Sequence, residues 1–163
     1  MKFILVRHGK SDWDTNQTDH DRPLAPRGIR AAEKIGRWLV SKGHFPQTVL
    51  CSTATRTRQT WEGIGKLVPA PKEEVFVSAL YGASPGMMLK HLQNAKSGTV
   101  MMIGHNPGSA ELASIVLPKP PQSLHFYRFP TCATMVCEFP SNEWKNINLG
   151  EAHLLDFVVP REL

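Results

Sequence analysis

Two histidines and two arginines in this chain stand where they could bind and transfer a phosphoryl group. Each lies at or just beyond the end of an apolar run, and they are Arg7, His8, Arg56 and His105. A guanidinium pairs bidentately with phosphate oxygens, and a neutral imidazole can attack phosphorus and hold the phosphoryl group covalently. A second imidazole, if protonated, can stabilise charge on the equatorial oxygens in the transition state. We therefore expect a phosphate-handling site where these side chains meet.

Neighbouring residues could serve the same anion. Gly9 would allow close backbone approach at a crowded centre. Helices that begin beside Arg56 and after Asn106 would point backbone N–H groups at an anion. Each feature alone has a structural alternative, since Arg7 could pair with a carboxylate and Asn106 could simply cap a helix. The agreement of three strand ends is what favours phosphate chemistry.

The elements that must position these residues alternate between strands and helices. Strands are expected at 3–6, 48–52, 74–77 and 98–104, and helices at 26–42, 54–67, 85–95 and 107–117. This alternation predicts βαβ units and a largely parallel sheet covered on both faces. Ligands of such sheets bind beyond the carboxyl ends of the strands, which is where the histidines and arginines stand.

The alternation ends in the last part of the chain. Segments 133–139 and 144–149 predict a hairpin across PSNE and hence an antiparallel edge. Between them and the last helix, Phe126 and Phe129 are expected to pack inside, while a role at the site is left open for the residues between them. The expected fold is a single α/β domain over residues 1–163, a three-layer α/β/α sandwich with about five or six strands.

The composition of the chain excludes several classes of partner and of binding site. The net charge of +5 comes without a long Lys/Arg run, which argues against a nucleic-acid groove and suits an anionic substrate. The three cysteines have no C-x-x-C spacing, so neither a disulfide framework nor a zinc site is expected. No apolar run is long enough for a membrane span or a signal peptide. A cytoplasmic monomer without a membrane or nucleic-acid partner is the expectation.

Three motifs together resemble the histidine phosphatase superfamily, also called phosphoglycerate mutase-like. They are Arg7-His8-Gly9, the segment 52–60 around Arg56, and Gly104-His105-Asn106-Pro107. The short length and the segments RHGKSDW and DHDRPLAPRG resemble the small phosphohistidine phosphatases of the SixA-like branch. The resemblance implies a phosphoglycerate mutase-like fold, needing no metal or other cofactor. It makes His8 the phosphorylated nucleophile, puts Arg7, Arg56 and His105 in its phosphate pocket, and suggests Arg22 as a further substrate contact.

One departure from the larger members of that superfamily bears on the substrate. Those proteins carry a glutamate after the third strand that protonates an oxygen leaving group, whereas segment 77–84, VSALYGAS, has no acid. Glu73 and Glu74 are expected at the opposite end of that strand. We therefore expect hydrolysis through phospho-His8, with phosphohistidine on a protein as the favoured substrate. A small-molecule phosphomonoesterase and a phosphate- or phosphoprotein-binding module with little turnover remain alternatives.

The loop after the first strand is dense in ionisable residues. It holds Asp12, Asp14, Asp19, His20 and Asp21. These residues lack a recognised metal-ligand spacing, and the nearby Arg7 and Arg22 would oppose a cation. The sequence therefore predicts a solvated loop that shapes the entrance of the pocket rather than a metal site.

Overall fold

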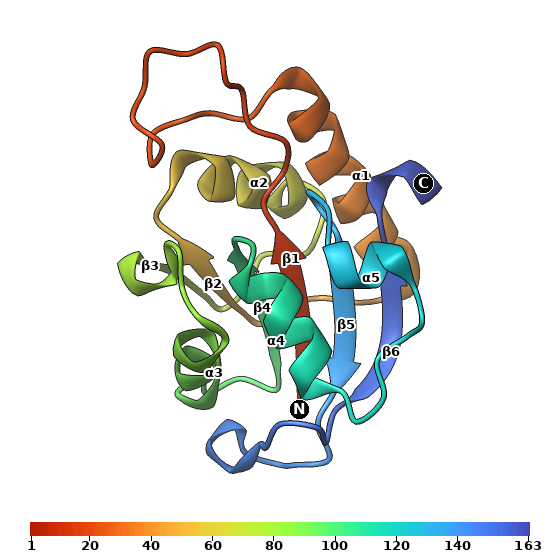
Figure 1. The fold of residues 1–163 in the computed structure, drawn as a ribbon. Helices are drawn as coiled ribbons and strands as arrows, with labels where there is room; N and C mark the ends of the chain where they lie inside the picture. Colours follow the sequence, from red (N-terminus) through yellow and green to blue (C-terminus); the bar gives the residue numbers. More distant parts are fainter.

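A six-stranded sheet with helices on both faces forms the centre of the molecule (Figure 1). The computed structural model describes residues 1–163. The strands are β1 (Lys2–Arg7), β2 (Thr48–Ser52), β3 (Glu73–Val77), β4 (Thr99–Gly104), β5 (Thr134–Glu138) and β6 (His153–Val158). Their order in the sheet is β3-β2-β4-β1-β5-β6. The first four strands are parallel, and β5 is antiparallel to both of its neighbours. The sheet is therefore mainly parallel, with its reversed strand one place in from the edge.

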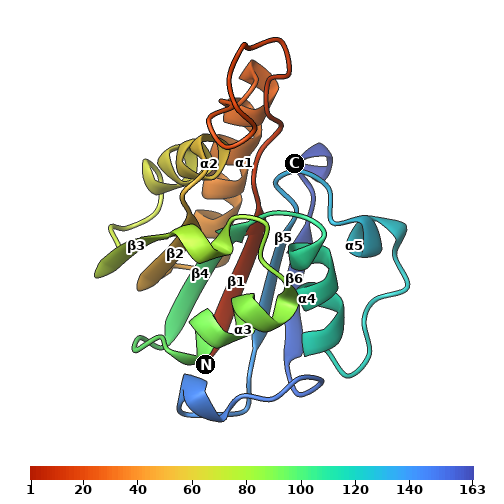
Figure 2. The same ribbon diagram turned by 60° about the vertical axis from the view of Figure 1, so that its left-hand side comes forward.

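Helices cover the two faces in separate groups (Figures 1 and 2). They are α1 (Pro26–Lys42), α2 (Thr55–Gly65), α3 (Pro85–Gln93), α4 (Gly108–Val116) and α5 (Leu124–Arg128), with short 3-10 helices η1 (Ser78–Leu80), η2 (Trp144–Asn146) and η3 (Pro160–Glu162). Helices α1 and α2 pack on one face, and α3, α4 and α5 on the other. None of the helices combines the length and apolar character needed to span a membrane.

The central strand β1 contributes to both hydrophobic cores. Phe3 and Leu5 pack into the core beneath α3, α4 and α5, while Ile4 and Val6 pack into the core beneath α1 and α2. All four side chains are fully buried. Alternate side chains of a strand point to opposite faces, so a strand covered on both faces is apolar without interruption. This is why all four residues of the run FILV are apolar.

Most predicted elements agree with the structure to within two residues, but the predicted strand at 144–149 is wrong. That segment begins with η2, and β5 pairs instead with β6. Trp144 and Ile147 are both buried, and a spacing of three fits a helical turn better than a strand. The indole Nε1 of Trp144 also donates to the carbonyl of Ser97. Burial of Trp144 thus favours a helical turn over a strand in this segment.

The segment before β5 contains an additional short helix, α5. Phe126 and Phe129 are fully buried, as the sequence predicts. Their rings pack edge to face with centroids 6.5 Å apart, and both pack on Phe157 of β6. The aromatic cluster fixes the chain that runs from α5 to β5, and that chain borders the carboxyl end of β1.

Candidate active site

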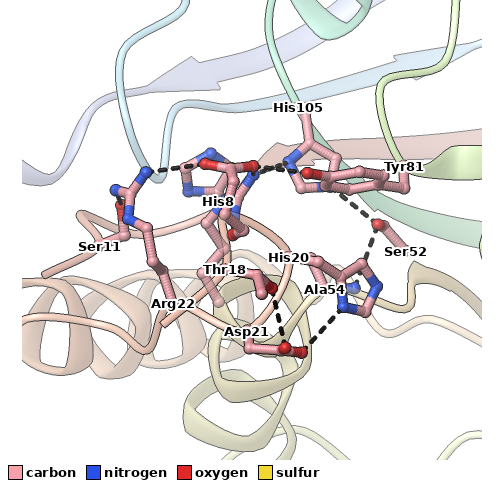
Figure 3. Close-up of polar contacts among 12 residues, drawn as sticks. His8, Ser11, Thr18, His20, Asp21, Arg22, Ser52, Ala54, Tyr81 and His105 are labelled. Carbon is pink, nitrogen blue, oxygen red and sulfur yellow. Dashed lines mark hydrogen bonds and ion pairs between the residues drawn. The ribbon is translucent and has the colours of Figure 1, made fainter. Parts of the chain in front are cut away.

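The carboxyl ends of β1 and β4 bring two histidines together. Arg7 lies opposite Gly104 in the parallel pairing, and the backbone N–H of His8 donates to the carbonyl of Gly104 at 3.1 Å. The ring centroids of His8 and His105 are 5.1 Å apart, and Figure 3 shows the two rings side by side between Arg22 and Tyr81. The structure thus joins side chains from the first and third motifs at one buried point.

His8 has one ring nitrogen fixed and the other free. Its Nδ1 lies 2.7 Å from the carbonyl oxygen of Gly9, which can only accept, so Nδ1 carries the proton and Nε2 carries a lone pair. Burial is the main cause that lowers the pKa of His8 to about 4, and the charges of Arg56, Arg7 and Arg22 act in the same direction. The imidazole is therefore neutral at neutral pH, with Nε2 in the form that can act as a nucleophile.

His105 is neutral as well, in the opposite tautomer. Its Nδ1 lies 3.3 Å from Nη2 of Arg56, and a guanidinium can only donate. The proton therefore sits on Nε2, which donates to Oγ of Ser52 at 2.8 Å. Burial, followed by the neighbouring His8 and Arg56, lowers the pKa of His105 to about 3. A protonated His105 would thus require a nearby anion to stabilise it.

Three arginines surround these rings. Arg22 and Arg56 are buried, which is rare for this residue unless it is paired. Arg7 donates from Nη1 to the carbonyl of Phe129 at 3.0 Å, and its Nε is buried without a hydrogen-bond partner. Burial also lowers the pKa of Arg7. The histidine pair thus lies in a strongly positive environment suited to a phosphate dianion.

An aspartate from the loop before α1 already binds two of these arginines. Oδ1 of Asp19 accepts from Nη1 of Arg22 at 2.8 Å, and Oδ2 accepts from Nη2 of Arg56 at 3.1 Å and from the hydroxyl of Tyr81 at 2.6 Å. The hydrogen bond from Tyr81 is the largest cause that lowers the pKa of Asp19 to about 2, with the two arginines adding to it. The carboxylate is therefore an internal anion at the arginine cluster.

The sequence did not distinguish Asp19 from the other acids of its loop. Its spacing of three from Arg22 was the one local signal available. The partners Arg56 and Tyr81 lie 37 and 62 positions away in the chain. The sequence did not point to Tyr81, and it placed Ser52 in the 52–60 motif without a role, although both residues contact His105.

Arg22 also holds the loop that begins after His8. Its Nη2 donates to Oγ of Ser11, and its Nε donates to the carbonyl of Asp12 at 3.1 Å. The Trp13 ring lies against the guanidinium, 3.4 Å from its centroid to Cζ of Arg22. The loop is thus attached to the same arginine that binds Asp19.

Asn106 and Gly9 lie at the site but contact its framework. Nδ2 of Asn106 donates to the carbonyls of Arg128 and Phe129 at 3.0 and 3.1 Å. A Cβ atom on Gly9 would lie 3.0 Å from the carbonyl oxygen of Gly28, so this glycine allows the loop to approach α1. Both residues therefore position the segments that carry the arginines and His8, and their direct contact with a substrate stays a prediction.

The two glutamates of β3 do not take part in the site. Glu73 and Glu74 are at the amino end of β3, and Glu74 accepts from the indole of Trp61 at 2.9 Å. The segment after β3 contributes Tyr81 in place of an acid. No group of three or more His, Cys, Asp or Glu side chains is arranged to hold a metal ion.

Comparisons with known proteins agree with this arrangement. The family described as histidine phosphatase superfamily (branch 1) matches residues 3–87. The uncharacterized protein Rv1276c of Mycobacterium tuberculosis is 36% identical, and the alignment covers 96% of this chain and all of the relative.

Two solved structures share the fold. A SixA protein of Nakamurella multipartitia is 28% identical with a TM-score of 0.80, and the match covers 98% of this chain and 95% of that one. The protein histidine phosphatase SixA bound to tungstate is 22% identical with a TM-score of 0.82, and the match covers 99% of both chains. These matches confirm the predicted phosphoglycerate mutase-like α/β fold.

Proposed function

Because this chain belongs to the histidine phosphatase superfamily, we propose that it is a phosphohistidine phosphatase that carries the phosphoryl group on His8. The tautomer of His8 is the observation that carries the proposal. Its Nδ1–H is held by the carbonyl of Gly9, which leaves the Nε2 lone pair among three arginines. A neutral, oriented imidazole in a cationic pocket is what attack on a phosphoryl group requires.

The reaction has two displacement steps. In the first, Nε2 of His8 attacks phosphorus, the bond from phosphorus to the substrate nitrogen breaks, and a substrate protonated on its other ring nitrogen leaves as neutral imidazole. In the second, water attacks phospho-His8, the bond to Nε2 breaks, a proton of the water passes to a phosphoryl oxygen, and inorganic phosphate departs. Arg7, Arg56 and Arg22 would bind the equatorial oxygens in both steps. His105, once an anion is bound, would add a further donor.

The leaving group supports phosphohistidine over an alkyl phosphate. An alkoxide needs protonation, and a general acid typically contributes about two to four decades in rate. Segment 77–84 has no acid, and Asp19 is ionised with its pKa near 2. Imidazole has an ordinary pKa of about 6.5 and leaves without such help. The two related solved structures are named as SixA histidine phosphatases, and those names support phosphohistidine as the substrate.

The position of Asp19 supports a second candidate function. If an incoming phosphate took its place on Arg22 and Arg56, the released carboxyl group would have a higher pKa beside a dianion. It would then be an acid close to the leaving group. A small-molecule phosphomonoesterase is therefore the alternative that the geometry favours.

The comparison of three substrates tests the proposal. We expect kcat/KM to be higher for a phosphohistidine peptide and an aryl phosphate than for a phosphoserine peptide, with a chelator present throughout. His8→Ala should abolish turnover, and the exposed His153→Ala, on the outer strand β6, should retain it. Rapid quenching should trap acid-labile phosphate on His8. Turnover by His8→Ala, or a phosphoserine value at or above that for phosphohistidine, would refute the proposal.

A further inference from the structure

A concave surface lies beside the candidate active site, and six of the twelve residues that line it are lysines or arginines. It occupies about 520 Å³ between the start of α1, α5 and η3, near the C-terminal end that Figure 2 labels. Its basic side chains are Lys10, Arg27, Arg30, Lys34, Arg128 and Arg161. No aspartate or glutamate lines it. We refer to these six residues as the basic pocket.

No aspartate or glutamate neutralises the charge of the basic pocket. None of its six cations pairs with a side-chain carboxylate, although Arg37 and Lys42 of the same helix α1 pair with Glu33 and Asp156. Lys34 donates to the main-chain oxygens of Pro160 and of Leu163, the last residue of the chain. Positive charge concentrated in a concavity attracts and orients anions.

The acidic residues closest to the basic pocket in sequence have other partners than its cations. The Glu33 carboxylate binds Arg37 at 3.3 Å, and that of Glu162 accepts from the backbone N–H of Val159, at the wall of the pocket, at 3.4 Å. The six cations therefore remain available to an anion from outside.

The basic pocket shares its walls with the candidate active site. Lys10 lies two residues after His8, and its carbonyl accepts from the backbone N–H of Ala25 at 2.8 Å. Arg128 is held on the other side, because its carbonyl accepts from the Asn106 amide. A protein that presents a phosphoryl group to His8 would therefore lie across or next to the basic pocket.

We propose that the basic pocket docks an acidic segment of the phosphoprotein substrate while the phosphoryl group enters the site at His8. The inference rests on the proposed function, and it adds a chemical criterion for the partner: carboxylates close to the phosphorylated residue. Complementary charge at such a surface mainly raises the association rate and selects among partners. A cavity of this size also has room for a small polyanion, and the binding experiment below distinguishes that ligand from an acidic peptide.

Charge reversal at two positions of α1 tests the docking surface. Arg27 and Arg30 are exposed and have no side-chain hydrogen bond or ion pair, and glutamates near the N-terminus of a helix are compatible with the helix dipole. The variant is Arg27→Glu/Arg30→Glu. The matched control is Lys66→Glu/Lys72→Glu, which changes the net charge equally at two exposed lysines outside the pocket.

Two phosphohistidine peptides serve as probes, one flanked by glutamates and the other by glycine and serine. At low salt, kcat/KM of the wild-type protein should be about tenfold higher for the acidic peptide. Arg27→Glu/Arg30→Glu should lose this preference and keep wild-type turnover of an aryl phosphate, while the control keeps both. A retained preference, or an equal loss with the aryl phosphate, would overturn the docking role.

A binding experiment separates this inference from the proposed function. A labelled, unphosphorylated glutamate-rich peptide should bind the wild-type protein and the control, and bind Arg27→Glu/Arg30→Glu about tenfold more weakly. If that pattern holds while no phosphohistidine peptide is hydrolysed, docking stands and the proposed function fails. If inorganic triphosphate binds at the pocket and the peptide does not, the pocket serves a small polyanion and the docking proposal is overturned.

Discussion

A carboxylate of the protein itself already binds the arginine cluster, and this affects how a substrate can bind there. Asp19 contacts Arg22, Arg56 and Tyr81 through both carboxylate oxygens. A phosphoryl group that uses the same two guanidiniums must compete with that carboxylate. Asp19 is about half exposed at its side chain, so it can leave the cluster without disrupting a core. We interpret it as an internal competitor.

Asp19→Asn should therefore strengthen oxyanion binding. The amide keeps the size of the side chain but loses its charge, so the inhibition constant of tungstate or inorganic phosphate should fall by about tenfold at most, the scale of an exposed ion pair. Asp21→Asn is the matched control, because Asp21 has the same exposed fraction of 54% and contacts His20 and Thr18 instead of the arginines. Weaker oxyanion binding in Asp19→Asn would mean that the carboxylate holds the arginines in place for the substrate.

The two buried histidines predict a pH dependence of stability. Their pKa values are lowered to about 4 and about 3, mainly by burial, while the unfolded chain takes up protons near 6.5. Between these values the unfolded state binds more protons, so the free energy of unfolding should decrease as the pH falls from 6.5 towards 4. Denaturant unfolding of the wild type and of His8→Gln/His105→Gln should reveal a smaller decrease in the variant. Equal slopes in both proteins would contradict the neutral histidine pair.

At the scale of elements, the site depends on the close approach of α1 to the loop after β1. A Cβ atom on Gly28 would lie 2.3 Å from the carbonyl oxygen of Lys10 and 2.9 Å from its nitrogen. On the other side of the same contact, Gly9 approaches the carbonyl of Gly28, and its N–H donates to Oγ1 of Thr60 at 2.9 Å. Two glycines thus let one helix fix the backbone that carries His8.

Gly28→Ala should damage stability and activity together. The methyl group forces the backbone near Lys10 to move, and such overpacking costs about 1–3 kcal/mol. A displacement of about 1 Å at a catalytic group can cost about 100-fold in rate. Gly86→Ala is the control, because Gly86 is the second residue of α3 with no atom within 4 Å of an added Cβ, and alanine there should be neutral or stabilising. Thermal unfolding and aryl phosphate turnover measure both effects, and a fully active Gly28→Ala would show that α1 does not fix His8.

At the scale of the whole molecule, the sequence predicts best what repeats along the chain. Alternating apolar strands and helices gave the mainly parallel sheet, and the shared edge of parallel strands predicted that His8 and His105 meet. What it missed depends on contacts between distant residues. Asp19 reaches its partners across a loop, and Trp144 turns a strand-like segment into η2 by burial. No local periodicity records either contact, so neither was predictable from the pattern alone.

The stacking of Trp13 on Arg22 gives the protein an optical signal of its own. Trp13 is 69% exposed and lies against the guanidinium that binds Asp19. Of the other three tryptophans, Trp61 and Trp144 are buried in the cores, and the partly buried Trp38 packs against His44. Any ligand that takes Arg22 from Asp19 changes the surroundings of this indole, and fluorescence from Trp13 would change with it. We therefore expect that ligand binding at the candidate active site can be followed in solution by this fluorescence, without a label and without turnover.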